Sequence, residues 1–407
     1  MKILILNDSW PPESMGGADK VAFNLARAIK RRGNEVRVIT TTQDKRKEGI
    51  LEEEGMKVYR IYTKYSERWR AWLSLYNPVA VRRVKKVIRD FKPDVVHAHN
   101  IHFYLSYTCL RVAKKSGAKV FLTAHDVMSF SYGKLGTKKY LEEGDGFLSW
   151  RDNLRRAKKR YNPLRNILIR YYLSFVDKII AVSEALKKVL EQNGIKKVMV
   201  VHNGIETKEW EVSEEKIEEF KKVRGWEDKK LILFGGRLSE GKGARKVIEA
   251  MKVVEKEALQ VILLVLGKKD WYAKEIEGLA EKEGVGEKVV MTGWISGETL
   301  KEAMGASEVV CVPSAYLDPL PTVVLEAMAA GKPVVGTCWG GTSEMVVDRE
   351  TGLIVDPRNT EDLAQALLEI ITKKERAKKM GIAGKERVRR EFDLESKSEE
   401  IFSIYKN

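Results

Sequence analysis

Residues 231–243 read Leu-Ile-Leu-Phe-Gly-Gly-Arg-Leu-Ser-Glu-Gly-Lys-Gly, an apolar run that passes directly into a glycine-rich loop. Such a run is typical of a strand buried on both faces of a parallel sheet, and the helical pattern that follows completes a strand-loop-helix unit. The same order opens the chain, where Lys2–Asn7 predicts a strand, Gly16-Gly17 closes a loop and Ala18–Arg32 predicts a helix. The sequence therefore begins the same α/β pattern twice.

Each half of the chain alternates short β-rich runs with amphipathic helical stretches, which is typical of a doubly wound parallel sheet. The further expected strands are Glu35–Thr41, Val95–Ala98, Lys119–Thr123 and Lys178–Val182 in the first half, and Leu231–Phe234, Val261–Leu266, Val289–Thr292, Val309–Pro313 and Pro333–Gly336 in the second. A single hydrophobic core seldom exceeds about 250 to 300 residues, and this chain has 407. We expect two Rossmann-like domains facing across a cleft, with Glu206–Lys230 and its own helix from Ser213 to Arg224 as the crossing.

The composition, at 43% hydrophobic and 32% charged residues, is typical of a soluble enzyme with a charge content like that of thermophile proteins. Met1 leads directly into the first strand, and no apolar run reaches the roughly 18 residues that span a bilayer. We therefore expect a cytoplasmic protein that at most lies on a membrane surface. Cys109, Cys311 and Cys338 lack the spacing of a metal site and predict buried thiols in a reducing compartment.

Positive charge is concentrated in the first half of the chain. Residues 1–205 contain 41 Lys and Arg against 20 Asp and Glu, whereas residues 206–407 contain 33 against 38. The densest run predicts a patch for the anionic inner face of the cell membrane or for a phosphorylated acceptor; a solvated helix face and nucleic acid are the alternatives. We expect no nucleic acid, because zinc modules, recognition helices and stacking sheets are lacking. The patch residues are Arg151, Arg155, Arg156, Lys158, Lys159 and Arg160.

Two loops carry candidate phosphate-binding groups. At Gly16-Gly17 the backbone can approach a ligand and the helix start offers free amides to phosphate, the alternative being a tight turn without a ligand. At Gly236, Arg237 and Lys242 a guanidinium fork and an ammonium group suit a diphosphate, the alternative being solvated surface cations. The second loop follows the carboxyl end of a strand, where doubly wound sheets bind ligands, and this favours the phosphate-binding interpretation.

The most specific stretch is residues 313–335, in which two acids eight positions apart flank a proline. Pro321 suits the first turn of a helix that carries Glu326 inward, while Asp318 stays on the preceding loop. A carboxylate accepts two hydrogen bonds at once, which matches a vicinal diol of a ribose or a sugar. The alternatives are that Asp318 caps the turn and that Glu326 pairs with a nearby base.

Histidines gather at two predicted strand ends. His97, His99 and His102 lie within six residues, and His125 ends the next strand with Asp126 beside it. Alternation places His97 and His99 on one face, so a metal site is conceivable, but strand-end histidines in a cleft more often bind substrate. We expect no metal, and we expect His125 to face a sugar.

These residues resemble the retaining glycosyltransferases of the GT-B fold, family 4, also called glycosyl transferases group 1. The motifs that carry the resemblance span nearly the whole chain and are Pro11-Pro12 with Gly16-Gly17, Pro93–His97, Thr123–Asp126, Ala181–Glu184, His202–Ile205, Gly236–Leu238 with Lys242-Gly243, Thr292–Trp294 and the acid pair Asp318 and Glu326. In that family the last helix crosses back onto the first domain. The resemblance implies an acceptor-binding domain of residues 1–205 joined by a helix at about 392–407, and a nucleotide-sugar-binding domain of residues 206–391.

The resemblance also implies roles for single residues. Gly16 and Gly17 would lie against the donor phosphates, and His125 would contact the transferred sugar. Arg237 and Lys242 would neutralise the diphosphate. The resemblance thus implies a nucleotide diphosphate sugar as donor and co-substrate, with no further cofactor.

The acid motif has its own implied roles and two departures from the family pattern. Glu326 would hold the ribose and Asp318 the sugar hydroxyls, with His125, Arg237 and Lys242 completing the implied catalytic set. Asp318 replaces the usual Glu, which shortens the arm, and Leu320-Pro321 replaces the common Phe-Gly, which removes one backbone donor. The remaining implied substrate-binding positions are Gly236, Trp294, Leu320, Pro321 and Thr322.

The expected chemistry is a hexosyl transfer with retained anomeric configuration, by front-face displacement, in which fixed positive groups replace a metal ion. Domain closure would align the donor with the acceptor hydroxyl. The excess charge of the first half predicts an anionic, lipid-linked or membrane-surface acceptor, or another glycan. The alternatives are a soluble polysaccharide or disaccharide synthase, a nucleotide-sugar epimerase of the same fold, and a binding protein without catalysis.

Overall fold

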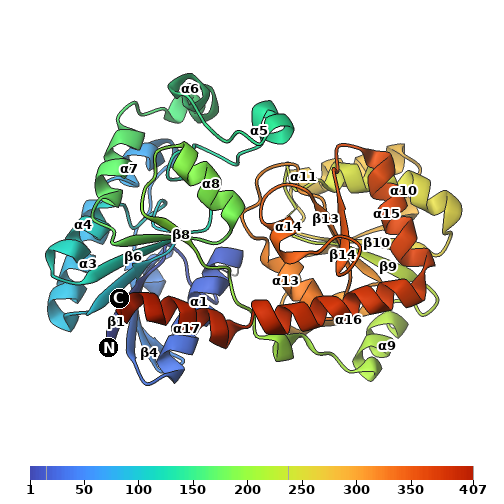
Figure 1. Cartoon of the computed structure of the whole chain (residues 1–407), viewed down its shortest axis with the longest axis horizontal. Helices are drawn as coiled ribbons and strands as arrows, with labels where there is room; N and C mark the ends of the chain where they lie inside the picture. Colours follow the sequence, from blue (N-terminus) through green and yellow to red (C-terminus); the bar gives the residue numbers. More distant parts are fainter. Residues whose placement is uncertain (15, 237, 407) are drawn as a thin grey trace. The chain divides into compact units, whose positions relative to one another are not determined.

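The computed structural model describes residues 1–14, 16–236 and 238–406. The chain forms two compact units: unit 1 comprises Met1–Gly204 with Leu394–Asn407, and unit 2 comprises Ile205–Asp393. Each unit is a predominantly parallel sheet with helices packed around it (Figure 1). Both are doubly wound α/β domains, which confirms the fold class predicted from the alternation of strand and helix patterns.

Unit 1 is built on an eight-stranded sheet. Its strands are β1 (Lys2–Leu6), β2 (Glu35–Thr42), β3 (Gly49–Glu53), β4 (Met56–Tyr62), β5 (Val95–Ala98), β6 (Lys119–Ala124), β7 (Lys178–Ala181) and β8 (Val198–Val200). Their order is β3-β4-β2-β1-β5-β6-β7-β8, and only β3 runs antiparallel to its neighbour. Because the chain moves outward from β1 in one direction and then returns to β5, the strand order switches between β1 and β5, where doubly wound sheets bind ligands.

The helices of unit 1 follow the strands in the right order for crossover connections. They are α1 (Gly17–Arg31), α2 (Arg70–Leu73), α3 (Pro78–Phe91), α4 (Thr108–Lys115), α5 (Lys138–Glu143), α6 (Trp150–Ala157), α7 (Arg165–Leu173), α8 (Glu184–Gln192) and α17 (Leu394–Lys406), with 3-10 turns η1 (Lys45–Lys47), η2 (Glu67–Trp69) and η3 (Lys158–Arg160). Local chemistry fixes their starts. Asn77 accepts hydrogen bonds from two amides of the first turn of α3, and Ser149 and Asp152 cap α6 reciprocally.

Unit 2 is built on a six-stranded, wholly parallel sheet. Its strands are β9 (Lys230–Phe234), β10 (Val261–Leu266), β11 (Val289–Gly293), β12 (Val309–Val312), β13 (Val334–Thr337) and β14 (Gly352–Val355), in the order β11-β10-β9-β12-β13-β14. Its helices are α9 (Glu214–Lys222), α10 (Ala244–Glu257), α11 (Trp271–Lys282), α12 (Gly297–Ala306), α13 (Thr322–Ala329), α14 (Thr342–Met345), α15 (Thr360–Thr372) and α16 (Lys374–Glu391), with 3-10 turns η4 (Thr207–Trp210) and η5 (Gly286–Lys288). Here the strand order switches between β9 and β12.

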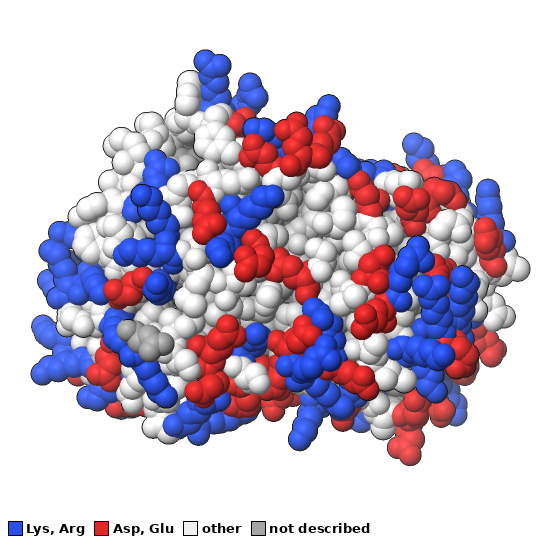
Figure 2. Space-filling view, viewed as in Figure 1, with Lys and Arg blue, Asp and Glu red and all other residues white. Residues whose placement is uncertain are grey.

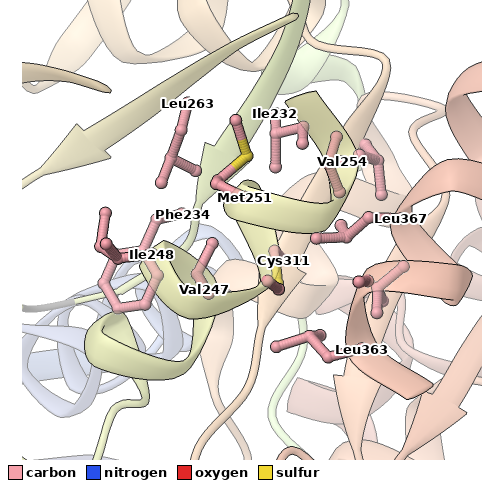
Figure 3. Packing of buried hydrophobic residues seen from close by; sticks show 14 of the residues in the cluster. Ile232, Phe234, Val247, Ile248, Met251, Val254, Leu263, Cys311, Leu363 and Leu367 are labelled. Atoms are coloured by element: carbon pink, nitrogen blue, oxygen red, sulfur yellow. The ribbon is translucent and has the colours of Figure 1, made fainter. Parts of the chain in front are cut away.

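The core of unit 2 lies between the sheet and helices α10 and α15. Ile232 and Phe234 of β9 and Cys311 of β12 meet Met251 and Leu367 of these helices, all of them buried (Figure 3). Burial of apolar surface stabilises the fold by roughly 25 cal/mol for each Å² removed from water, so this packing stabilises the position of the strand ends. The loops that follow β9 and β12 therefore project from a rigid base.

Helix α17 packs within unit 1, against α1 and the sheet. Leu394, Ile401 and Tyr405 are buried, and the Tyr405 hydroxyl lies 2.6 Å from Nδ1 of His97 in β5. The Lys119 ammonium group donates to the Tyr405 carbonyl at 3.1 Å. The final amphipathic stretch thus has the packing partner that its apolar residues require.

Four strands were not anticipated from the sequence. The run Gly49–Glu53 is an exposed edge strand, and a strand open to water on both faces has no apolar alternation to recognise. Its neighbour, Met56–Tyr62, carries the charged residues Lys57 and Arg60 among its apolar residues. Val198–Val200 and Gly352–Val355 have only 3 and 4 residues, respectively. Short or charged strands are specified by their sheet neighbours more than by their own pattern.

The prediction of three buried thiols is wrong for Cys338, which is exposed, whereas Cys109 and Cys311 are buried. Cys338 follows the last residue of β13 and lies on the loop to α14, beyond the sheet that would have covered it. In the ranges 1–14, 16–236 and 238–406, no helix combines the length and the apolar character needed to cross a bilayer.

Candidate functional site

The glycine-rich loop of unit 2 joins β9 to α10. Gly236, Gly241 and Gly243 have φ of +115°, +87° and +86°, a region that L side chains rarely adopt. Gly243 also lies so close to the Pro313 carbonyl oxygen that a Cβ atom would clash with it. Arg237, predicted to hold the diphosphate, lies outside the described residues.

Three loops converge at the switch point of unit 2, because they follow the adjacent strands β9, β12 and β13. The amide of Ala315 donates to the Gly241 carbonyl at 2.8 Å, which ties the second loop to the first. The amide of Gly341 donates to the Asp318 carbonyl at 2.9 Å, and a Cβ atom at Gly340 would clash with that carbonyl. Sequence reasoning missed this third loop, because its two glycines are required by their close approach to the backbone of Asp318 and Pro319.

Lys242 and Asp318, which sequence reasoning assigned to separate parts of a ligand, form an ion pair with each other. Lys242 Nζ contacts Asp318 Oδ2, and the Ser314 hydroxyl donates to the same oxygen at 2.9 Å. The side chains are only 13% and 7% exposed. Burial is the largest single influence and lowers the pKa of Lys242, but the Asp318 carboxylate and Tyr316 together raise the pKa above its usual range, so Lys242 is charged.

Tyr316 completes this group, and sequence reasoning missed it. The Lys242 ammonium group lies 5.5 Å from the centre of the Tyr316 ring, within the range of a cation–π contact. Burial raises the pKa of the Tyr316 hydroxyl, which therefore stays protonated at neutral pH. A lysine held by one acid and one aromatic face at the switch point of the sheet is a fixed positive charge.

Helix α13 starts beside this group. Pro321 occupies the N-cap position, so the helix begins at Thr322, and Leu320 and Pro321 are buried. Glu326, one turn into the helix, is 7% exposed, as the inward placement predicted. The first amides of a helix have no partner within the helix, so α13 directs partial positive charge toward the loops.

Trp294 does not belong to the convergent loops by sheet order. It follows β11, which is the edge strand, and β10 and β9 separate β11 from β12. Its side chain is 50% exposed. Its predicted place beside a nucleotide base remains a prediction.

The predicted phosphate loop of unit 1 ends at Gly16, the N-cap of α1, and Gly17 is the first helical residue. Asp19 in the first turn accepts hydrogen bonds from Asn7 Nδ2 at 2.9 Å and from the Ser9 hydroxyl at 3.0 Å. These bonds fasten the loop to the start of α1, where the first amides have no partner within the helix.

Asp8, two residues after the end of β1, is buried and was not singled out from the sequence. Its carboxylate accepts from the amides of Phe103, Tyr104 and Leu105 at 2.6, 2.9 and 2.7 Å. Burial raises the pKa of Asp8 to about 6, although these three amides act in the opposite direction. Asp8 therefore fixes the backbone that follows β5 at the switch point.

The predicted histidine cluster is present, and its members differ in their partners. His97 lies within β5 with both nitrogens engaged, Nδ1 with Tyr405 and Nε2 with the Thr123 hydroxyl at 2.8 Å. His99 and His125 follow β5 and β6, with Nδ1 of His99 lying 2.9 Å from Nε2 of His125. Burial lowers the pKa of His97 to about 3 and that of His125 to about 4, so both are neutral at pH 7.

Asp126 lies near two arginines that were not anticipated, the buried Arg165 and the half-buried Arg70. His102 Nε2 lies 3.3 Å from Asp126 Oδ2. Burial lowers the pKa of the Arg70 and Arg165 guanidinium groups, and Asp126 partly offsets this for both. Arg70 lies 3.4 Å above the Phe103 ring. Arg70 comes from α2 and Arg165 from α7, and their spacing in the sequence could not have placed them near Asp126.

The predicted basic patch divides into an exposed part and a structural part. Lys and Arg side chains project over α6 in Figure 2, and Arg151, Arg155, Lys158 and Lys159 are exposed. Arg156 departs from the prediction of a surface cation, because its guanidinium contacts the Ser131 hydroxyl and the Lys134 carbonyl. Arg160 is only half exposed. Apolar side chains share this surface: Trp150, Leu154, Leu164 and Ile167 are 63%, 43%, 52% and 57% exposed.

Comparisons with known proteins agree with this architecture. The chain matches the family Glycosyltransferase Family 4 over residues 15–209 and the family Glycosyl transferases group 1 over residues 216–387. It is 29% identical to an uncharacterized glycosyltransferase of Methanocaldococcus jannaschii over 378 residues, which cover 89% of this chain and 87% of that protein.

Two solved structures have the same fold. Sucrose-phosphate synthase of Thermosynechococcus elongatus superposes with a TM-score of 0.79 at 22% identity, over 100% of this chain and 98% of the other. HepE of Anabaena, solved with UDP-glucose, superposes with a TM-score of 0.74 at 20% identity, over 99% of each chain.

Two doubly wound units with a convergent loop cluster define the GT-B class of enzymes, as the resemblance predicted. The chain belongs to the group 1 glycosyltransferases of this fold.

Proposed function

We propose that the enzyme transfers a sugar from a nucleoside diphosphate sugar to an acceptor hydroxyl with retention of the anomeric configuration. The observation that carries the proposal is the buried Lys242–Asp318 pair at the switch point of unit 2. A buried charge needs a partner, and here each charge has the other. A bound diphosphate sugar offers both of them a replacement.

The replacement preserves pairing throughout. Oxygens of the diphosphate would replace Asp318 as the partner of Lys242, and sugar hydroxyls would donate to Asp318. Neither charge would then be without a partner in the protein. Negative charge grows on the diphosphate as it leaves, so a fixed ammonium group stabilises the transition state more than the ground state. Arg237 and Gly236 would assist from the same loop, and the amides of α13 add a favourable dipole.

The remaining proposed donor contacts come from α13 and the residues before it. Glu326, buried in α13, would accept hydrogen bonds from the ribose diol, and Leu320, Pro321 and Thr322 would line the sugar. Asp318 already binds Lys242 and Ser314, so we propose that it acts as a binding group. Among the described residues, we assign no side chain as a covalent nucleophile. We therefore propose front-face displacement with retention as the mechanism.

We further propose an anionic, lipid-linked acceptor bound through unit 1. The support is the surface of α6, η3 and α7, where exposed Arg155, Lys158 and Lys159 lie among exposed Trp150 and Leu154. Cations attract anionic headgroups while indole and leucine side chains bury in the interface, a combination typical of peripheral membrane proteins.

The decisive experiment offers the purified chain a panel of uridine, guanosine and adenosine diphosphate sugars, with and without acceptor lipids. We expect one donor to raise the melting temperature and to release its nucleoside diphosphate when an acceptor is present. Glu326→Ala is the control and should lose that stabilisation. NMR of the product decides the stereochemistry, since an inverted linkage excludes the proposed mechanism.

The same panel separates the alternatives. A soluble saccharide synthase would act on free sugar acceptors and ignore lipids. An epimerase would convert the donor with no acceptor present. Absence of both donor stabilisation and turnover would refute a transferase that uses these donors.

A further inference from the structure

One buried imidazole of unit 1 has only one of its two nitrogens satisfied. His99 is 2% exposed, and its ring lies nearly parallel to that of His125, with 17° between the planes. Nδ1 of His99 lies 2.9 Å from Nε2 of His125. Nε2 of His99 is buried and has no hydrogen-bond partner among the described residues. Such an atom is costly unless a water or a ligand satisfies it.

A small cavity adjoins this ring. It measures about 20 Å³ and is lined by His99 together with the polar residues Thr123, His202, Asn203, Lys397 and Ser398 and with apolar residues of α1, β7 and α17. A cavity of that size holds one water, and a buried water typically makes about three hydrogen bonds. The walls offer enough polar groups for it.

The contact between the two imidazoles carries a single proton. Burial keeps the pKa of both rings below the usual histidine value, so both are neutral, and each then carries one N–H. Either His125 donates from Nε2, or His99 donates from Nδ1. In the first case His99 carries its proton on Nε2, so the nitrogen without a partner is a donor. In the second case His99 carries its proton on Nδ1, so the nitrogen without a partner is an acceptor.

The cavity wall favours the first arrangement. The Ser398 hydroxyl donates to the Glu395 carbonyl at 2.9 Å, so a water beside it must donate to Ser398. A water that donates one O–H to Ser398 keeps one O–H and two lone pairs, so it has more capacity to accept than to donate at the remaining walls, and a lone pair matches an N–H at Nε2 of His99.

We propose that this cavity holds one water which accepts from His99 Nε2–H, and that His99 thereby holds the proton of His125 on Nε2. Nδ1 of His125 is then an unprotonated acceptor, suited to a hydroxyl of the substrate and not to a phosphate. His99 is a positioning residue in this scheme. The role toward substrate rests on the proposed sugar transfer, whereas the tautomer does not.

NMR of the whole chain with ¹⁵N-labelled histidine rings tests the tautomer directly, because the protein has only 5 histidines. We expect both His99 and His125 to be protonated at Nε2, and Ser398→Ala to shift the His99 ring nitrogens. Ser174→Ala is the matched control, since Ser174 donates to the Tyr171 carbonyl in the same way but lies on the exposed end of α7. A His125 proton on Nδ1 overturns the proposal, and the measurement needs no substrate.

Kinetics test the positioning role. Removing the His99 acceptor in His99→Phe should lower kcat about 100-fold, within the range of one general acid–base or orienting group, while the donor KM changes less than about threefold. His99→Asn places a carbonyl oxygen near the position of Nδ1 and should recover at least about tenfold of this loss. A kcat within twofold of the wild type in folded His99→Phe contradicts the role. If that variant does not fold, the wild-type spectrum and Ser398→Ala still decide.

Discussion

Unit 1 and unit 2 use the same edge of the same kind of sheet for different electrostatic purposes. In unit 2 the switch point carries a charged pair, Lys242 with Asp318, on loops clamped by glycines. In unit 1 the corresponding edge carries three neutral imidazoles, because burial lowers the pKa of His97, His99 and His125. All 5 histidines lie before residue 205, so this chemistry belongs to one unit.

The difference indicates a division of labour. A permanently charged lysine suits a leaving group that gains negative charge, because its stabilisation grows as the bond breaks. Neutral imidazoles suit hydroxyl groups, because each ring offers one hydrogen-bond donor and one acceptor in fixed orientations without net charge. The comparison predicts that variants in unit 2 alter chemistry most and variants in unit 1 alter orientation and pH response.

The largest expected effect comes from Lys242→Met. Loss of one charge stabiliser of this kind costs about 10² to 10³ in kcat, and the buried Asp318 left alone destabilises the fold by about 3 to 5 kcal/mol. The double variant Lys242→Met/Asp318→Leu removes both charges and should recover most of the stability but none of the activity. Urea unfolding and nucleoside diphosphate release measure the two. Near-normal turnover by the double variant would show that the pair serves the fold alone.

The loop clamp gives the next largest effect. Gly243→Ala places a Cβ against the Pro313 carbonyl at a φ of +86°. Crowding of a packed site costs about 1 to 3 kcal/mol and a left-handed residue about 1 to 2 kcal/mol, so we expect a loss of about 2 to 5 kcal/mol. Gly278→Ala in α11 meets nothing within 4 Å and should stabilise by about 0.5 to 1 kcal/mol. Equal effects at both positions would contradict the close packing of these loops.

Unit 1 should respond to pH in two opposite directions. The folded pKa of His97, about 3, lies below its ordinary value of 6.5, so the stability that it contributes is complete above pH 6.5 and is lost as the pH falls. The folded pKa of Asp8, about 6, lies above its ordinary 3.8, so its contribution is complete below pH 3.8 and is lost as the pH rises through about 6.

Between pH 4 and 6 each group therefore changes the slope of stability against pH by about 1.4 kcal/mol per unit, with opposite sign. His97→Phe should flatten the loss of stability toward acid, and Asp8→Asn should steepen it. Urea denaturation at pH 4.5, 5.5 and 6.5 gives both slopes. Parallel slopes in the two variants would mean that the burial of these groups does not govern their titration.

How much of this could be read from the sequence depends on the kind of signal. The strands Val95–Ala98 and Val261–Leu266 were predicted with their observed bounds, because short runs rich in valine, leucine and isoleucine are typical of buried parallel strands. Lys242, Asp318, Glu326 and His125 were all found at strand ends or on the following helix, as a strand-loop-helix pattern requires.

What the sequence could not supply was partnership across the fold. Lys242 and Asp318 are 76 residues apart, and their pairing depends on the adjacency of β9 and β12. Arg165 and Arg70 lie near Asp126 only because α7 and α2 bring them there. Arg156 was misassigned to the surface because its carbonyl partner, Lys134, lies on another loop. Close approach, as at Gly340, likewise has no local signature.

The smallest expected effect concerns the exposed basic surface. Replacing Arg155, Lys158 and Lys159 by Glu should weaken binding to vesicles that contain anionic lipid by at least roughly fivefold for each charge, and the loss should shrink in high salt. The same exchange at exposed Lys374, Lys378 and Lys379 of α16 is the control and should leave vesicle binding unchanged. Equal losses in both triple variants would indicate nonspecific attraction, and no loss in either would refute a membrane role for α6.

The central claim, that the convergent loops of unit 2 bind a nucleoside diphosphate through Lys242, is tested most directly by calorimetric titration of the whole chain with UDP, GDP, ADP and the matching monophosphates. The account predicts that one diphosphate binds, that its monophosphate binds at least about tenfold more weakly for want of the second phosphate, and that Lys242→Met/Asp318→Leu loses the diphosphate while remaining folded. Unchanged diphosphate affinity in the folded double variant, or equal affinity for the monophosphate, would contradict it.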